Sequence, residues 1–145
     1  MSMLKKLTAT RYVDQGLLVL RVGLGVMFLF HGWPKLSGGP EKWAKVGGAM
    51  STLGLDFAPA FWGFMAAATE FVGGALLIVG LATRPASFLL VCTMAVATIM
   101  HVSKGHEFSK ISHPLEDGIA FLALLIMGAG VYSLDHKLFG ERDDA

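Results

Sequence analysis

Glu70 is the clearest candidate for chemistry in this sequence, because it is the single charged residue in the apolar stretch 59–81. A carboxylate near the middle of a membrane span is rare and usually faces protein. The residues at helical spacing around it are small, which lets another helix pack closely: they are Gly63, Ala66, Ala67, Gly73 and Gly74. Glu70 is therefore predicted to point into a helix bundle, as a proton carrier, a ligand-binding carboxylate or one half of an ion pair.

Arg21, inside the first apolar stretch 13–33, is the candidate partner of Glu70. If the two stretches are antiparallel helices, the residues are offset by roughly 4.5 Å along the helix axes at 1.5 Å per residue, which a guanidinium can cover. Helical side chains lean towards their own N-terminus, so these two lean in opposite directions. We expect Arg21 and Glu70 to share a polar pocket, directly or through a ligand or water; the alternative is that Arg21 snorkels to the membrane surface.

Four histidines fall on one side of the membrane if the chain crosses it four times: His31, His101, His106 and His113, with His136 on the other side. Such a group can bind a metal, hold a haem between His31 and His101, or hydrogen-bond and deprotonate a quinol. The plain alternative is a set of ordinary interfacial histidines. The spacing is not a metal motif, and His101 and His106, five residues apart, do not share a helical face. Neither a metal nor a haem is expected.

The segment His31-Gly32-Trp33-Pro34-Lys35 closes the first apolar stretch. This segment can be an anchor where the chain leaves the membrane. Alternatively, His31 and Lys35 form one wall of a binding site, with His101 on the opposite wall. Aromatic residues suited to a flat ligand surround this position: Phe28, Phe30, Trp33, Phe61, Trp62 and Phe64. The predicted binding residues are Arg21, His31, Lys35, Glu70 and His101, and no residue is assigned as catalytic.

A membrane is the predicted setting for these residues. The chain has 145 residues, of which 54% are hydrophobic and 16% charged, against roughly 45–50% and 25% in soluble domains. Its mean hydropathy is +0.59, so lipid is the predicted solvent, with residues 1–145 as one domain. A net charge of +1 gives no footprint for nucleic acid. The lone Cys92 excludes an internal disulfide and a CxxC redox pair.

Four apolar stretches can cross a bilayer as helices, at 13–33, 59–81, 85–102 and 118–134. Between the first two, residues 40–54 predict a short amphipathic helix at the membrane surface with Trp43 as an anchor; the alternative is a loop helix outside the membrane. The predicted fold is an all-α, four-helix transmembrane bundle. Six basic residues on the side of the termini, against five on the other side, favour cytoplasmic termini.

Three motifs, in this order, give the chain a family resemblance. They are His31-Gly32-Trp33-x-Lys35-Leu36, Glu70-x-x-Gly73-Gly74-x-Leu76-Leu77-x-x-Gly80-Leu81-x-Thr83-Arg84, and Gly128-x-Gly130-x-Tyr132-Ser133-Leu134-Asp135. Over about residues 14–136 the chain closely resembles the DoxX family of small bacterial inner-membrane proteins, with a departure at Ala129, where the last motif often has proline. The resemblance implies a four-helix transmembrane bundle and a role beside respiratory or detoxifying redox enzymes. It also directs attention to His31, Lys35, Glu70 and Arg84.

Two functions from different classes agree with these observations. The first is a quinone- or quinol-interacting subunit that binds a small aromatic molecule and works beside a soluble or membrane oxidoreductase. Whether it is itself an enzyme stays open; if so, it depends on that partner, because one cysteine and no Gly-rich phosphate loop predict no redox cofactor of its own. The second is a non-enzymatic scaffold that anchors a soluble redox enzyme or forms homo-oligomers through glycine-rich helix faces. A quinone is the one bound small molecule expected.

Overall fold

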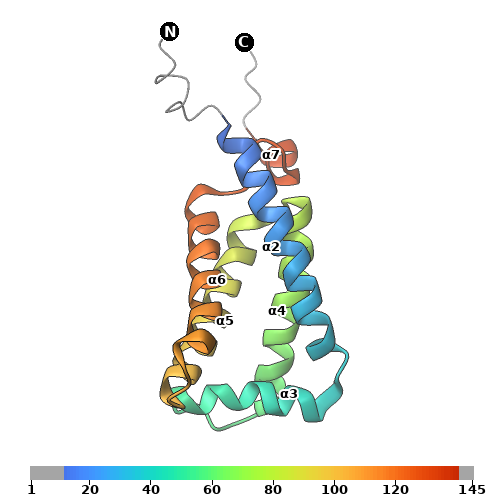
Figure 1. Ribbon diagram of the computed structural model, residues 1–145. Helices are drawn as coiled ribbons and strands as arrows, with labels where there is room; N and C mark the ends of the chain where they lie inside the picture. Colours follow the sequence, from blue (N-terminus) through green and yellow to red (C-terminus); the bar gives the residue numbers. More distant parts are fainter. Residues whose placement is uncertain (1–11, 141–145) are drawn as a thin grey trace, which may run out of the picture.

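The computed structural model describes residues 12–140, and every regular element in that range is helical. The elements are α2 (Val13–Leu36), α3 (Gly39–Gly47), the 3-10 helix η1 (Gly48–Leu53), α4 (Pro59–Val79), α5 (Thr83–Ser103), α6 (Phe108–Met127) and α7 (Leu134–Phe139). The long helices α2, α4, α5 and α6 run side by side in alternating directions, while α3 lies across one end and α7 lies at the other (Figure 1). The prediction of an all-helical fold is confirmed.

Three helices, α2, α4 and α5, are long and apolar enough to cross a membrane, with windows of mean hydropathy 1.7, 1.6 and 1.8. They confirm the helices predicted at 13–33, 59–81 and 85–102, with ends that shift by at most three residues. α2 continues through Pro34 to Leu36, because a proline so near the C-terminus removes only one backbone donor. α4 starts at Pro59, where the missing N–H would have no helical partner anyway.

The prediction of a helix over 118–134 is wrong in its bounds, because α6 runs from Phe108 to Met127. Gly128 and Gly130 end it with φ angles of 80° and 75°, a backbone that glycine adopts at little cost. Asp117, predicted just before the helix, lies inside it. α6 is not among the three described helices that are long and apolar enough to cross a membrane. It packs along α5.

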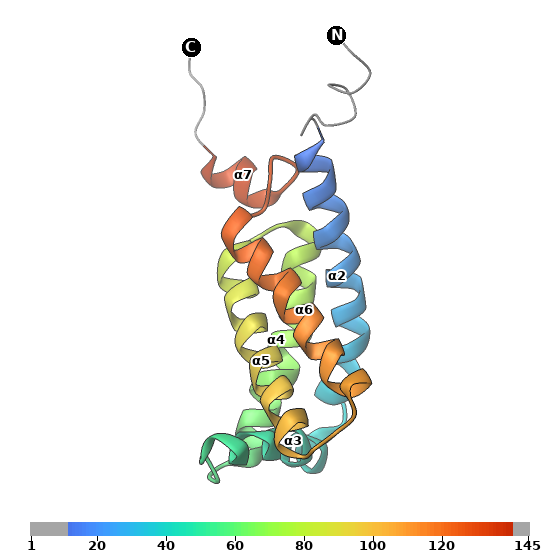
Figure 2. The same cartoon turned by 60° about the vertical axis from the view of Figure 1, so that its left-hand side comes forward.

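The helix predicted over 40–54 is present as α3 followed by η1. It crosses the ends of the long helices instead of running beside them (Figure 2). Trp43, predicted as a membrane anchor, donates its indole N–H to the carbonyl oxygens of Lys35 and Leu36, both at 3.1 Å. Its ring packs against Phe64 with centroids 5.0 Å apart. Trp43 therefore ties α3 to the end of α2.

Glycines bring the backbones of α2, α3 and α4 into contact. A Cβ on Gly25 of α2 would lie 2.6 Å from the carbonyl oxygen of Gly74 on α4, and Gly63 of α4 lies against the Trp43 carbonyl of α3. The small residues near Glu70 thus face neighbouring helices, as predicted. Between the long helices the apolar core consists of Leu17, Phe28, Leu77, Leu90, Met94, Phe121 and Leu124.

The basic residues divide between the two ends of the molecule as the topology predicts. Those at or near the α3 end are Lys35, Lys42, Lys45, Lys104 and Lys110. Arg84 and Lys137 lie at the α7 end. The other four residues predicted on that side, Lys5, Lys6, Arg11 and Arg142, lie outside the described residues.

Candidate functional site

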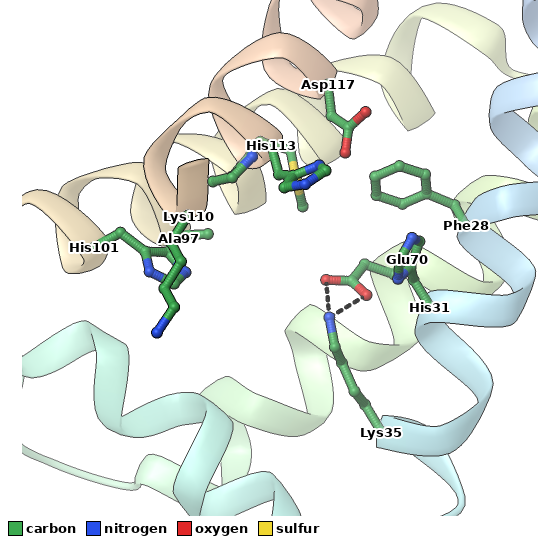
Figure 3. A pocket seen from close by; sticks show the side chains of 11 residues that line it. Phe28, His31, Lys35, Glu70, Ala97, His101, Lys110, His113 and Asp117 are labelled. Atoms are coloured by element: carbon green, nitrogen blue, oxygen red, sulfur yellow. Dashed lines mark hydrogen bonds and ion pairs between the residues drawn. The ribbon is translucent and has the colours of Figure 1, made fainter. Parts of the chain in front are cut away.

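A cavity of about 370 Å³ lies between α2, α4, α5 and α6, towards the α3 end of the molecule (Figure 3). Four of the five predicted binding residues line it: His31 and Lys35 come from α2, Glu70 from α4 and His101 from α5. The lining is completed by Phe28, Met94, Ala97, Lys110, His113, Pro114 and Asp117. Residues far apart in the sequence thus line one pocket.

Lys35 and Glu70 form an ion pair in this cavity. The Lys35 Nζ lies 2.8 Å from Oε1 and 2.6 Å from Oε2 of Glu70, so the ammonium donates to both carboxylate oxygens. The side chain of Glu70 is 4% exposed and that of Lys35 is 33% exposed. The inward orientation predicted for Glu70 is confirmed, and its cation comes from the end of α2.

Side-chain direction explains why Lys35, and not Arg21, meets Glu70. α2 and α4 are antiparallel neighbours (Figure 1), and each helical side chain leans towards the N-terminus of its own helix. Lys35 and Glu70 therefore lean towards each other. Arg21 lies four turns from Lys35, about 21 Å at 1.5 Å per residue, and leans away from Glu70. The prediction that Arg21 and Glu70 share a polar pocket is wrong.

Arg21 belongs to a second network, at the α7 end. Its side chain is fully buried, so it does not snorkel to the surface. Nη1 donates to the carbonyl of Leu77 at 2.9 Å, and Nη2 donates to the carbonyl of Tyr132 at 2.6 Å. Asp135 of α7 accepts two backbone N–H groups at the start of α5, at 2.7 and 2.8 Å. The motif over residues 128–135 thus fastens α7 to α2, α4 and α5.

Arg84 also lies at the α7 end. Its Nη2 donates to the carbonyl of Ile126 at 3.3 Å, and it lines a second cavity, of about 580 Å³, together with Asp14 and Asp135. Asp14 accepts the backbone N–H of Val131 there at 3.0 Å. Both carboxylates are thus engaged with backbone groups, and this cavity shares no lining residue with that of Glu70.

Three polar residues of α6 line the first cavity but are absent from the predicted binding residues, although His113 belongs to the predicted histidine group: they are Lys110, His113 and Asp117. The prediction starts the fourth helix at residue 118, so it assigns them to a loop. Their spacing of three and four residues places them on one face of a helix, and the same face continues to the buried Phe121. This periodicity is the signal that could have identified them.

Fewer of the predicted aromatic residues line the cavity than expected. Phe28 lines the cavity and meets His31 edge to face, with ring centroids 5.8 Å apart. The other aromatic residues predicted around the site do not line it: Phe30, Trp33, Phe61, Trp62 and Phe64. Several of these point outward, and Phe30 is 73% exposed. They belong to the apolar exterior of the molecule.

His101 and His106 are in contact, contrary to the expectation from their spacing. Their Nδ1 atoms lie 2.7 Å apart, because the chain reverses direction at Gly105 after α5 ends. His113 lines the cavity from α6, and His136 lies at the α7 end. Within residues 12–140, no group of three or more His, Cys, Asp or Glu side chains is placed to hold a metal ion.

The cavity offers hydrogen-bond donors, acceptors and proton carriers beside an apolar surface. The ammonium groups of Lys35 and Lys110 donate, and the carboxylates of Glu70 and Asp117 accept. Three imidazoles, of His31, His101 and His113, can do either, depending on their tautomer. This combination suits a small ring compound whose oxygen atoms gain and lose protons.

Comparison with known proteins identifies one family and several relatives. The pattern that defines the DoxX family matches residues 16–102. The chain is 34% identical over 135 residues to an uncharacterised protein of Haemophilus influenzae, which covers 89% of this chain and 95% of that protein. It is 30% identical over 128 residues to the Escherichia coli inner membrane protein YqjF, covering 86% and 93%. It is 36% identical over 84 residues to CatD of Bacillus subtilis, which is named as a candidate oxidoreductase, covering 58% of each chain. Among solved structures, none matches at a significant level.

Proposed function

The chain belongs to the DoxX family of membrane proteins, and on this basis we propose that it binds a small aromatic molecule of the quinone class in the cavity of Lys35 and Glu70. The observation that carries the proposal is that four side chains selected from the sequence for this role line one cavity. The protein works beside a membrane-associated oxidoreductase that supplies or accepts the electrons. The Escherichia coli relative, named an inner membrane protein, supports the bacterial inner membrane as its location.

The size and lining of the cavity support a quinone as the ligand. Its volume of about 370 Å³ lies at the lower end of the roughly 300–1,000 Å³ typical of small-molecule sites. A quinone has two carbonyl oxygens that need donors, which Lys35, His31 and His101 supply. The quinol has two hydroxyls that need acceptors, which the imidazoles and the Glu70 carboxylate supply. Phe28 offers an aromatic surface to the ring.

Oxidation of a quinol releases protons as well as electrons, and the two leave by different routes. The histidines accept protons, because imidazole gains and loses a proton in the physiological pH range. The electrons pass to another protein, since the sequence has one cysteine and no Gly-rich phosphate loop. The name of the relative CatD supports a redox setting.

We also propose α6 as a fourth membrane-crossing segment, with both termini in the cytoplasm. α6 runs antiparallel to α5 and packs along it (Figure 2). Its polar residues Lys110, His113 and Asp117 line the cavity, so they lower its hydropathy without having to meet lipid. In this arrangement α3 lies at the outer surface of the membrane, across the ends of the long helices.

Extraction of lipophilic molecules from the purified protein tests the quinone proposal. The full chain is purified in mild detergent, and bound compounds are identified by mass spectrometry alongside an absorption spectrum. We expect a quinone in the wild type and its loss in Glu70→Gln and His101→Ala. The matched controls are Glu107→Gln and His136→Ala, which change the same residue types outside the cavity.

The outcomes separate the two classes of function. A quinone retained in both cavity variants, or no quinone in the wild type, contradicts the proposal and favours the non-enzymatic scaffold. A Soret band in the absorption spectrum also contradicts it, because that band indicates bound haem.

A further inference from the structure

The imidazoles of His101 and His106 are joined by a hydrogen bond, with their Nδ1 atoms 2.7 Å apart and their ring centroids 4.9 Å apart. This bond requires one Nδ1 that carries a proton and one that does not, so a single proton lies between the rings. The Nε2 of each ring makes no hydrogen bond to any residue in the described part of the chain. Each ring therefore keeps one nitrogen for another partner.

The end of α5 fixes the pair in place. Gly105 adopts a φ of 63°; the His106 N–H donates to the His101 carbonyl at 3.1 Å, and the Gly105 N–H donates to the Val102 carbonyl at 3.0 Å. These two bonds form a Schellman motif, in which the first and last residues face each other, usually through apolar side chains. Two imidazoles occupy those positions here, so the backbone itself sets their contact.

The pair connects the cavity with its exterior. His101 lines the cavity, whereas His106 is half-buried in the turn after α5 and does not line it. The C-terminus of a helix favours a positive charge on His101. Lys104 and Lys110 lie close enough to His101 for their own positive charges to disfavour it. The other titratable or charged groups that line the same cavity are His31, Lys35, Glu70, His113 and Asp117. Within the described residues no carboxylate forms a hydrogen bond or ion pair with either ring, so no anion stabilises a further proton on the pair.

We propose that His101 and His106 form a proton relay between the cavity and the solvent at the α3 end. This rests on the proposed function, since the proton donor is a quinol hydroxyl. The hydroxyl gives its proton to Nε2 of His101 and becomes a phenolate, and His101 passes its Nδ1 proton to Nδ1 of His106. His106 then releases its Nε2 proton to water. One proton leaves the cavity, no electron moves, and the hydrogen bond between the rings reverses direction.

A tethered indicator tests the relay without relying on quinone binding. Ala97 lines the cavity, so a thiol-reactive nitrophenol can be attached to Ala97→Cys in a Cys92→Ala background of the full chain. Its absorbance after a pH jump in a stopped-flow instrument reports proton exchange with the solvent. We expect His106→Gln to slow this exchange at least tenfold and added imidazole to restore it.

A matched variant and a second readout separate the relay from loss of structure. His136 lies at the other end of the molecule, outside the cavity and the pair, so His136→Gln should change the exchange rate less than twofold. In nitrogen NMR of histidine-labelled protein, His101 and His106 should titrate as one coupled pair with two separated steps. In His106→Gln, His101 should titrate in a single step.

Each outcome decides for or against the relay. An exchange rate that is the same in His106→Gln and its parent overturns it, as do two histidines that titrate independently. Equal slowing in His106→Gln and His136→Gln also overturns it, because that result indicates a general disturbance of the structure. A working relay in a protein that retains no quinone supports the histidine pair and contradicts the quinone assignment alone.

Discussion

Removing Lys35 and removing Glu70 should have different effects on the stability of the protein. Lys35→Met leaves a carboxylate that is 4% exposed without a cation, whereas Glu70→Gln leaves a lysine that is 33% exposed and can reach water. Breaking a buried pair destabilises a protein by about 3–5 kcal/mol. We expect Lys35→Met to lower the free energy of unfolding by about 3 kcal/mol, and Glu70→Gln by about 1 kcal/mol. Loss of helical circular dichroism on denaturation in detergent measures both.

The double variant Lys35→Met/Glu70→Gln should recover part of the loss caused by Lys35→Met, because it removes the uncompensated charge. Lys42→Met provides the control, since Lys42 is an exposed lysine of α3 that forms no ion pair with any residue in the range 12–140. Equal losses in the two single variants would show that the pair does not have the asymmetric burial described here.

Arg21 has a structural role, and its removal should separate stability from ligand binding. Arg21→Met removes the guanidinium donor from the carbonyls of Leu77 and Tyr132, although the Leu77 carbonyl keeps the Gly80 N–H at 3.2 Å. A carbonyl left without a donor costs about 1–3 kcal/mol, so we expect the free energy of unfolding to fall by about 2 kcal/mol. Quinone affinity of the folded protein, measured by equilibrium titration, should change less than twofold.

Arg84→Met is the control for that experiment, because Arg84 is exposed and its hydrogen bond to the Ile126 carbonyl is long, at 3.3 Å. Its effect on stability should stay within about 0.5 kcal/mol. A loss of quinone affinity in Arg21→Met at unchanged stability would show that Arg21 contributes to the ligand site.

The location of Glu70 could be predicted from the sequence because a lone charge among apolar residues must avoid lipid by facing protein. Its partner could not, since the predicted offset assumed that the two spans begin and end at the same level. In the structure Arg21 lies beside Leu77, about two helical turns from Glu70. The contact of His101 with His106 was hidden for another reason. It forms across a helix end, where helical periodicity no longer applies.

At the scale of elements, the packing of α3 across α4 helps to position Lys35. Lys35 lies at the end of α2, and Trp43 of α3 is bonded to that end. A Cβ on Gly47 would collide with the carbonyl of Pro59 and lie 2.6 Å from the backbone nitrogen of Gly63, whereas a Cβ on the adjacent Gly48 meets nothing within 4 Å. Gly47→Ala should therefore destabilise the protein by about 2 kcal/mol, as overpacking does. Gly48→Ala should stay within about 0.5 kcal/mol of the wild type.

Hydrogen exchange of the Trp43 indole N–H gives a local readout of the same change. That N–H bonds to the end of α2, so Gly47→Ala should speed its exchange and Gly48→Ala should not. If the two alanine variants behave alike in stability and exchange, α3 does not pack on α4 as described.

The bounds of α2, α4 and α5 could be predicted because hydropathy identifies residues that face lipid. α6 differs, because one of its faces carries Lys110, His113 and Asp117 towards the cavity. Hydropathy therefore places its start near residue 118, ten residues after its true start at Phe108. Periodicity, not mean hydropathy, holds the information in such a helix.

At the scale of the whole molecule, the proposed four crossings make a direct topological prediction. In a Cys92→Ala background, Lys42→Cys and Lys104→Cys should react with a membrane-impermeant maleimide from the periplasmic side, and Lys137→Cys only from the cytoplasmic side. Labelling of intact spheroplasts and of inverted vesicles distinguishes the two sides. Labelling of Lys104→Cys and Lys137→Cys from the same side would mean that α6 does not cross the membrane.

The central claim is that the cavity of His31, Lys35, Glu70 and His101 holds a quinone, and photolabelling with an azido-quinone in native membranes tests it most directly. We expect mass spectrometry to find the label on peptides that contain residues 94–101 and 110–117, which line the cavity. Excess unlabelled quinone should suppress this labelling, and Glu70→Gln should abolish it while Glu107→Gln does not. Label confined to outward-facing residues such as Phe30 and Ile119, or unaffected by competing quinone, would contradict the claim.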